Sequence, residues 1–182
     1  MTGLKDRKRV VIELFLDSLL PSPFLPGQGK LLDVGSGAGF PGLPLKIHCP
    51  RRVAFLVEPN SKKVSFLKHV IRLTGLREVQ TVKNRIEHLP KEVRYDVVTA
   101  RALAEFSKTL DWCAPLVDEG GLLVLYMGAR ADEHLKENER SVEHHHLRVF
   151  KMLSYALPEK RSERHTVIFE KEREDSLVAV KG

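Results

Sequence analysis

One stretch of the sequence constrains the fold more than any other, because it joins an apolar segment to a run of glycines. Residues 31–34 are Leu-Leu-Asp-Val, and glycine then stands at Gly35, Gly37, Gly39 and Gly42. Glycine has no Cβ, so it accepts positive φ angles and lets a ligand approach the main chain closely. A strand that passes through such a turn into a helix is typical of α/β proteins that bind nucleotides.

Two registers of the glycine run indicate different ligands. Counted from Gly37, the run satisfies the dinucleotide fingerprint G-x-G-x-x-G of nicotinamide-dependent dehydrogenases. Counted from Gly35, where the strand ends, that fingerprint fails because Phe40 occupies the position of the third glycine. The run then has the form Asp-x-Gly-x-Gly-x-Gly, as in Rossmann-like methyltransferases that bind S-adenosylmethionine (SAM). We favour this register over the dehydrogenase and over a purely structural turn, because Asp33 closes the predicted strand.

Segments of strand and helix type alternate from residue 30 onward, which predicts a parallel sheet with helices on both faces. We expect helices at 5–20, 61–74, 105–116 and 130–140, and a short helix through Leu45 and Ile47. We expect strands at 30–34, 53–57, 79–82, 95–100, 121–127, 147–157 and 165–169. Only the short charged loop 158–164 joins the last two strands, so they should form an antiparallel hairpin. The predicted fold is therefore an α/β fold with a mostly parallel seven-stranded sheet.

The length of 182 residues fits one domain with a core of its own. We expect an N-terminal helix and linker at 1–28, a nucleotide-binding domain at 29–171 and a tail at 172–182. Thirty Lys and Arg residues against 24 Asp and Glu residues give a net charge of +6. This excess favours an anionic partner such as nucleic acid, although plain solubility explains it equally well.

The cysteines and the apolar segments bear on the compartment. Cys49 and Cys113 lie far apart, which indicates neither a zinc site nor a disulfide framework. No apolar run approaches the length that a bilayer requires. Glu13 and Asp17 interrupt the apolar segment near the N-terminus, which does not resemble a signal peptide. We therefore expect a cytoplasmic protein with no membrane segment and no metal.

Side chains that follow the predicted strands are candidates for ligand contacts. Glu58 ends the second strand, 25 residues after Asp33, where an acid can accept hydrogen bonds from ribose hydroxyls. Arg101 ends the fourth strand and could face a cofactor carboxylate or an RNA phosphate, with a surface salt bridge an equal alternative. Ile86 and Glu87 follow the third strand, where they could meet an adenine ring. Their position alone favours an ordinary loop.

A longer match points to a family. The string DVGSGAGFPGLPL, from Asp33 to Leu45, resembles the RsmG (GidB) family of bacterial 16S ribosomal RNA methyltransferases, and its Pro-Gly-Leu-Pro-Leu ending is far more specific than the glycines. The resemblance extends over nearly the whole chain, from residue 2 to about 171. Further matches are KKVSFLKHV at 62–70, Arg85-Ile86-Glu87, Arg101-Ala102, Trp112-Cys113 and Arg164-His165.

The resemblance implies a class I SAM-dependent methyltransferase that methylates N7 of a guanine in 16S ribosomal RNA, free or in the small ribosomal subunit. We expect it to act as a monomer. Guanine N7 carries no proton, so no catalytic base is expected. The family's own contacts fall on Gly35, Phe40, Ile86, Glu87 and Arg101. With the turn and the ribose-binding acid, the predicted cofactor site consists of Asp33, Gly35, Ser36, Gly37, Gly39, Phe40, Glu58, Ile86, Glu87 and Arg101.

Three departures from the family pattern leave the acceptor open. Leu14 stands where the family usually has His, and Met127 stands where it commonly has Lys. The family also has a further helical segment upstream, so we expect the region 1–28 to be its truncated remainder. The cofactor site is intact. The alternatives are a SAM methyltransferase that acts on another RNA or a small molecule, and a non-catalytic RNA-binding relative.

Overall fold

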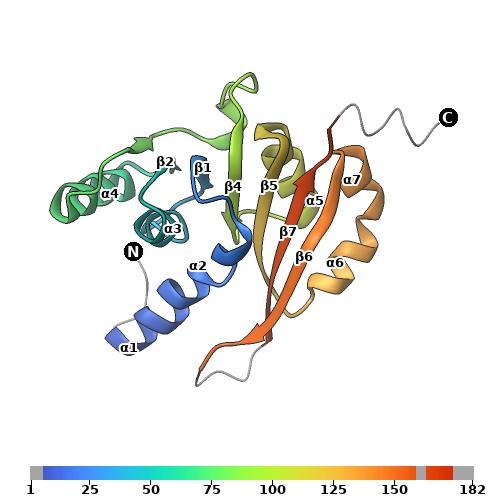
Figure 1. Cartoon of the computed structure of the whole chain (residues 1–182), viewed down its shortest axis with the longest axis horizontal. Helices are drawn as coiled ribbons and strands as arrows, with labels where there is room; N and C mark the ends of the chain where they lie inside the picture. The colour runs from blue at the N-terminus through green and yellow to red at the C-terminus, as the bar shows by residue number, and fades with distance from the viewer. Residues whose placement is uncertain (1–5, 159–162, 174–182) are drawn as a thin grey trace.

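The structure of the chain is a computed structural model that describes residues 6–158 and 163–173. A seven-stranded sheet in the order β3-β2-β1-β4-β5-β7-β6 forms its centre (Figure 1). The strands β1 to β5 run parallel to one another, whereas β7 is antiparallel to both β5 and β6. The predicted α/β fold with an antiparallel C-terminal hairpin is confirmed. The strands are β1 (Gly29–Val34), β2 (Arg52–Val57), β3 (Val79–Val82), β4 (Tyr95–Arg101), β5 (Val117–Gly128), β6 (Leu147–Ala156) and β7 (Glu163–Lys171).

The helices follow the predicted pattern with two interruptions. The predicted helix 105–116 ends in the 3-10 turn η4, and the predicted helix 130–140 is broken at Asn138, whose φ of −118° lies outside the α-helical range. The α-helices are α1 (Arg7–Val10), α2 (Asp17–Leu19), α3 (Gly42–His48), α4 (Ser61–Thr74), α5 (Phe106–Cys113), α6 (Ala131–Glu137) and α7 (Glu139–His144). The other helical segments are η1 (Val11–Leu16), η2 (Ser22–Phe24), η3 (Ile86–His88) and η4 (Ala114–Leu116).

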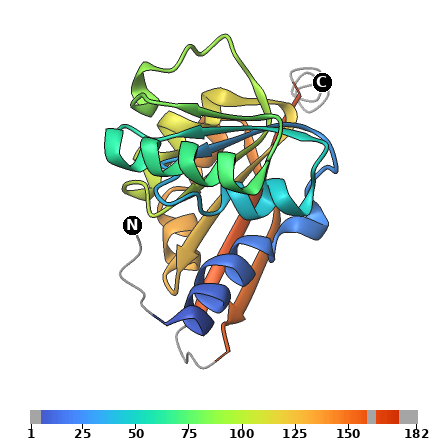
Figure 2. The same cartoon turned by 90° about the vertical axis from the view of Figure 1, so that its left-hand side faces the viewer.

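The first helix differs from an ordinary α-helix in its middle. Segment η1 is π-helical and joins α1 to α2 without a break, so the three segments form one N-terminal helix. A π-helical turn is rare and is frequently found at functional sites. In Figure 2 this helix runs beside the ends of β6 and β7, far from them in sequence. The predicted helix is therefore present, with a geometry that its apolar periodicity does not predict.

Both faces of the sheet are covered, which explains the unbroken apolar character of its strands. Leu32 of β1 packs in one core with Leu110 of α5 and Val142 of α7. Its neighbour Leu31 points to the opposite face and packs in a second core with Leu45 of α3. Figures 1 and 2 show α6 and α7 on the first side and the N-terminal helix on the second.

The strand order places a ligand-binding position between β1 and β4. From β1 the chain moves outward through β2 to β3 and then returns to β4 on the other side of β1. Open α/β sheets bind ligands outside the carboxyl ends of their strands at such a switch point. The glycine turn after β1 and Arg101 at the end of β4 both lie at this edge.

Some predicted segments extend beyond what the structure describes. These are residues 1–5 of the first helix, 159–162 of the loop between β6 and β7, and 174–182 of the tail. Within the ranges 6–158 and 163–173, no helix is both long and apolar enough to cross a membrane. The same ranges contain no group of three or more His, Cys, Asp and Glu side chains arranged to hold a metal ion.

Candidate active site

The glycine turn is held in shape by main-chain hydrogen bonds. The N–H of Ser36 donates to the carbonyl of Val57 at the end of β2 (3.0 Å), and the N–H groups of Gly39 and Phe40 donate to the carbonyl of Ser36 (2.7 and 3.1 Å). Gly35 has a φ of 67°, a left-handed conformation that glycine adopts without strain. The turn is therefore fixed against β2 and presents the main chain of its glycines at the carboxyl edge of the sheet.

Asp33 fastens this turn from inside the protein. Its side chain is fully buried, with Oδ1 accepting from the Thr99 hydroxyl (2.8 Å) and Oδ2 accepting from the Gly42 N–H (3.1 Å). Burial raises the pKa of this carboxyl to about 6, against the lowering effect of these hydrogen bonds. A Cβ at Gly42 would lie 2.7 Å from Asp33 Oδ2, so the helix approaches this closely only with glycine. Asp33 thus positions the turn by linking β1, β4 and the start of α3.

Glu58 meets the turn from the end of β2, as its place in the sequence predicts. Its buried carboxylate, 4% exposed, accepts from the N–H of Gly37 at 3.0 Å and from the N–H of Asn60 at 2.9 Å. Lys63 lies nearby, with its Nζ 3.8 Å from Oε2. An ionised carboxylate can accept about four hydrogen bonds, so each oxygen retains a position for a hydroxyl group. This carboxylate and the turn form one polar site.

The other predicted contacts lie along the same edge. Ile86 and Glu87 are in η3, the 3-10 turn that follows β3. The Ile86 side chain is buried in the core on the α5 side, whereas Glu87 is exposed. The ring of Phe40 packs edge to face on Phe15 of the N-terminal helix, with centroids 5.0 Å apart. The edge therefore offers main-chain groups and one exposed carboxylate beyond Glu58.

Arg101 has a partner in the N-terminal helix. Its Nη2 donates to Asp17 Oδ2 at 2.9 Å and to Ser18 Oγ at 3.1 Å, and its guanidinium carbon lies 4.6 Å from the centroid of the Tyr126 ring. The sequence left open whether Arg101 faces a ligand or forms a salt bridge at the surface. The structure contains the salt bridge, and it is largely buried. Arg101 Nε is buried and has no hydrogen-bond partner within the described residues.

Sequence reasoning missed Asp17, which is the centre of this polar cluster. Asp17 is 2% exposed and also binds Tyr155 Oη at 2.8 Å and Arg164 Nη1 at 3.2 Å. Glu13, one helical turn earlier, lies 3.8 Å from Arg164. The sequence signal was the pair of acids, four residues apart, within the mostly apolar segment 10–20. Their charges fix the N-terminal helix to the β6–β7 hairpin and to the end of β4.

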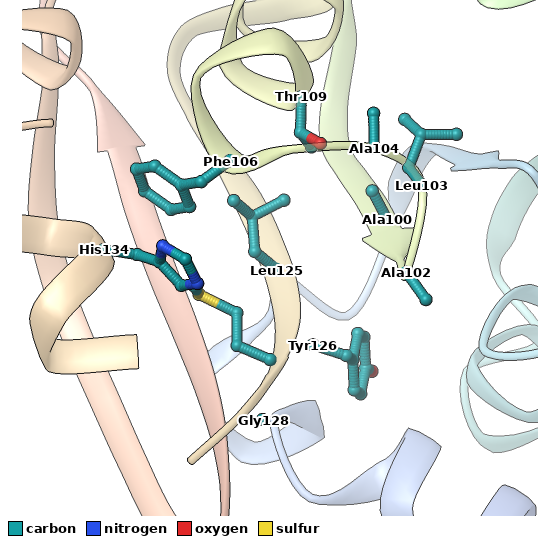
Figure 3. A pocket seen from close by; sticks show the side chains of 11 residues that line it. Ala100, Ala102, Leu103, Ala104, Phe106, Thr109, Leu125, Tyr126, Gly128 and His134 are labelled. Atoms are coloured by element: carbon teal, nitrogen blue, oxygen red, sulfur yellow. The ribbon is translucent and has the colours of Figure 1, made fainter. Parts of the chain in front are cut away.

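A cavity of about 220 Å³ lies at the carboxyl ends of β4 and β5 (Figure 3). The loop after β4, helices α5 and α6, and the end of β5 form its walls. No single segment predicts it, because four separate elements contribute. The lining residues are Ala100, Ala102, Leu103, Ala104, Phe106, Thr109, Leu125, Tyr126, Met127, Gly128 and His134.

Comparison with known proteins identifies the family. The family described as "GidB: rRNA small subunit methyltransferase G" matches residues 1–167. The chain belongs to this family. A ribosomal RNA small subunit methyltransferase G from Staphylococcus epidermidis is 35% identical over 181 residues, which cover 97% of this chain and 76% of that protein. One from Aeromonas salmonicida is 36% identical over 172 residues, covering 93% and 78% respectively.

Solved structures show the same fold. A methyltransferase from Pyrococcus furiosus superposes with a TM-score of 0.70 at 20% identity, covering 84% of this chain and 80% of that one. TYW2 from M. jannaschii, solved in complex with AdoMet, has a TM-score of 0.69 at 16% identity, covering 94% and 79%. The expected family, class I methyltransferase fold and enzyme class are confirmed. The chain is an rRNA methyltransferase, and its family implies the use of SAM.

Proposed function

We infer that this chain transfers the methyl group of SAM to N7 of a guanine in 16S ribosomal RNA. The observation that supports it most is the contact between the Glu58 carboxylate and the Gly37 N–H, at the carboxyl ends of β1 and β2. This contact joins the two parts of the sequence that indicate a nucleoside ligand, in a chain that belongs to an rRNA methyltransferase family.

The groups at this edge fit SAM part by part. Glu58 has acceptor positions for the two ribose hydroxyls, and the adenine is assigned to the main chain of Ile86 and the carboxylate of Glu87. The glycine turn, with Gly35 at its start, leaves room for the amino-acid portion beside the main chain. Arg101, at the adjacent strand end, is assigned to the carboxylate of that portion or to an RNA phosphate.

The reaction requires little from the chain beyond alignment of the reacting atoms. SAM, when bound, supplies a methyl group activated by a positively charged sulfur. The lone pair of guanine N7 forms the new N–C bond, the electrons of the C–S bond leave with sulfur, and no proton moves. The residues therefore have to hold nucleophile, methyl carbon and sulfur in line, and such positioning contributes much of a rate enhancement. Asp33 maintains the turn for this purpose through Thr99 and Gly42.

The assignment of Glu58 is tested by Glu58→Gln. Loss of an ionic acceptor for ribose hydroxyls removes about 1.5–3 kcal/mol, so the Kd for SAM should rise about 10- to 100-fold in calorimetric titration. Glu119→Gln is a matched control, because Glu119 is exposed and lies in the amino-terminal half of β5. Equal SAM affinity of wild type and Glu58→Gln would contradict the assignment, and a wild type that binds NAD instead of SAM would overturn the proposed function.

One observation favours testing a second acceptor. Met127 lines the cavity at the end of β5, at a position where the family commonly has Lys. A different acceptor would still use the cofactor site described above. Identification of the methylated nucleoside separates the two, because a guanine-N7 enzyme produces 7-methylguanosine in 16S ribosomal RNA.

A further inference from the structure

We propose that the cavity at the ends of β4 and β5 binds the target guanine after it leaves the RNA stack, and that Arg130 at its mouth binds the adjoining phosphate. This assignment rests on the proposed function and names the acceptor subsite within it. Enzymes that modify a base extrude it into a close-fitting pocket lined by aromatic and apolar side chains.

The size and place of the cavity fit one base better than a whole cofactor. Its volume of about 220 Å³ is below the roughly 300–1,000 Å³ of sites that enclose a drug-sized ligand. One wall belongs to the loop 102–104, and this loop touches the glycine turn: Leu103 Cδ1 lies 3.1 Å from the position that a Cβ on Gly35 would occupy. A base in the cavity would therefore lie next to the loop that contacts the turn assigned to SAM.

The lining is suited to a flat ring. The small side chains of Ala100, Ala102 and Ala104 line the side formed by β4 and its loop. Ala102 has a φ of 48°, a left-handed conformation that costs a residue with a Cβ free energy and that recurs at functional sites. The rings of Phe106 and His134 lie nearly parallel, at 8° with centroids 6.1 Å apart, and provide an aromatic wall.

Figure 3 places Leu103 and His134 on opposite sides of the cavity, with Leu103 on the side of the loop that touches the glycine turn. N7 and O6 lie on the same edge of guanine, so a guanine that directs N7 toward the turn directs its opposite edge, which carries the 2-amino group, toward His134. The His134 imidazole makes no hydrogen bond within the described residues, so its unprotonated ring nitrogen is available to accept from this amino group. Adenine has no amino group at this position, so this contact selects guanine.

A second hollow continues the site outward. Ala104, Phe106 and His134 also line an adjacent hollow of about 480 Å³, which is completed by Glu105, Ser107, Arg130 and Asn138. Arg130 is exposed, and unlike Arg101 it forms no ion pair in the part of the chain that the structure describes. A guanidinium binds a phosphate through two parallel hydrogen bonds. The inner cavity thus fits the base, and the outer hollow fits its sugar and phosphate.

Three variants test this assignment against SAM binding and methyl transfer to unmodified small ribosomal subunits. Ala104→Leu fills the cavity and should lower kcat/KM about a hundredfold, because displaced reactants lose alignment. His134→Leu keeps an apolar wall but removes the acceptor nitrogen, and should lower kcat/KM about tenfold. Arg130→Gln should raise KM alone and reduce the slope of log(kcat/KM) against log[salt] by about 0.7–0.9. All three should bind SAM as the wild type does.

The control is Arg148→Gln. Arg148 is an exposed arginine at the start of β6, at the end of the sheet that lies away from the cavity. It should change neither KM nor the salt slope. Parallel loss of SAM affinity in Ala104→Leu would show that the cavity holds the adenine of SAM, and would overturn the assignment. So would unchanged kinetics in both Ala104→Leu and His134→Leu.

Failure of the proposed function itself is distinguishable, because it appears in the wild type as absence of 7-methylguanosine. In that case the cavity is tested by binding of guanosine 5′-monophosphate, in the presence of S-adenosylhomocysteine, with adenosine 5′-monophosphate for comparison. The wild type should bind the guanosine nucleotide more tightly than the Ala104→Leu variant does. Equal binding by the two proteins would overturn the assignment.

Discussion

The buried carboxyl of Asp33 should make the free energy of unfolding depend on pH in the direction opposite to most acids. Its side chain is fully buried, and burial raises its pKa from 3.8 to about 6 even though Thr99 and Gly42 donate hydrogen bonds to it. The folded protein therefore holds the proton more tightly than the unfolded chain does. Between about pH 6 and pH 4 the folded state binds more protons than the unfolded state, so stability rises as the pH falls.

The size of the effect follows from the two pKa values. The difference between about 6 and 3.8 is about 2 pH units, which corresponds to about 3 kcal/mol. This contribution is absent above pH 6 and complete only below pH 3.8. Asp33→Asn removes the titration. The free energy of unfolding of the wild type minus that of Asp33→Asn should therefore increase by about 2 kcal/mol between pH 7 and pH 4, and approach about 3 kcal/mol at lower pH.

Urea unfolding of both proteins at several pH values measures this difference, and subtraction removes the contributions of the other titrating groups. Thr99→Val is a useful companion, because it removes a hydrogen bond that lowers the Asp33 pKa. In that background the pH dependence should shift to higher pH. A difference between wild type and Asp33→Asn that stays constant with pH, or decreases as the pH falls, would refute the reasoning.

The remaining predictions concern packing, the polar cluster and the thiols. Gly42→Ala places a Cβ 2.5 Å from a leucine side chain and should destabilise by about 1–3 kcal/mol in urea unfolding, whereas Gly128→Ala, with no atom within 4 Å, should not. Asp17→Ala leaves two arginines without their buried acceptor and should cost about 3 kcal/mol; unchanged stability would contradict the cluster's role. Burial raises the pKa of Cys113, so iodoacetamide should label Cys49 in the native protein and Cys113 only after unfolding, by mass spectrometry.

Local signals predicted the fold well where they coincide with the tertiary packing. Helix α4 begins at Ser61 and ends at Thr74, as predicted, because the Asn60 side chain accepts the N–H of Lys62 at its start and Gly75 adopts a φ of 63° at its end. The short connection between the last two strands correctly predicted an antiparallel hairpin. Glycine spacing located the turn, and Glu58 was correctly expected to meet it.

Features that depend on distant pairing were not predictable in this way. Strand β5 begins at Val117, four residues before the predicted start, because Val117 pairs with Tyr95 of β4. Asp17 and Tyr155 form a hydrogen bond although they lie 138 residues apart in the sequence, and no local pattern around either residue predicts this contact. The cavity is formed by four elements and has no motif of its own. Ion pairs and cavities of this kind arise only once the sheet order is fixed.

The most direct test of the central claim is to identify the methylated nucleoside. Small ribosomal subunits that lack the modification are incubated with the full chain and methyl-labelled SAM, and the 16S ribosomal RNA is digested and separated by liquid chromatography and mass spectrometry. The account expects the label in 7-methylguanosine, at a single position in the RNA. Label in another nucleoside would contradict the assigned acceptor, and the absence of label from RNA under conditions where SAM binds would contradict the proposed function.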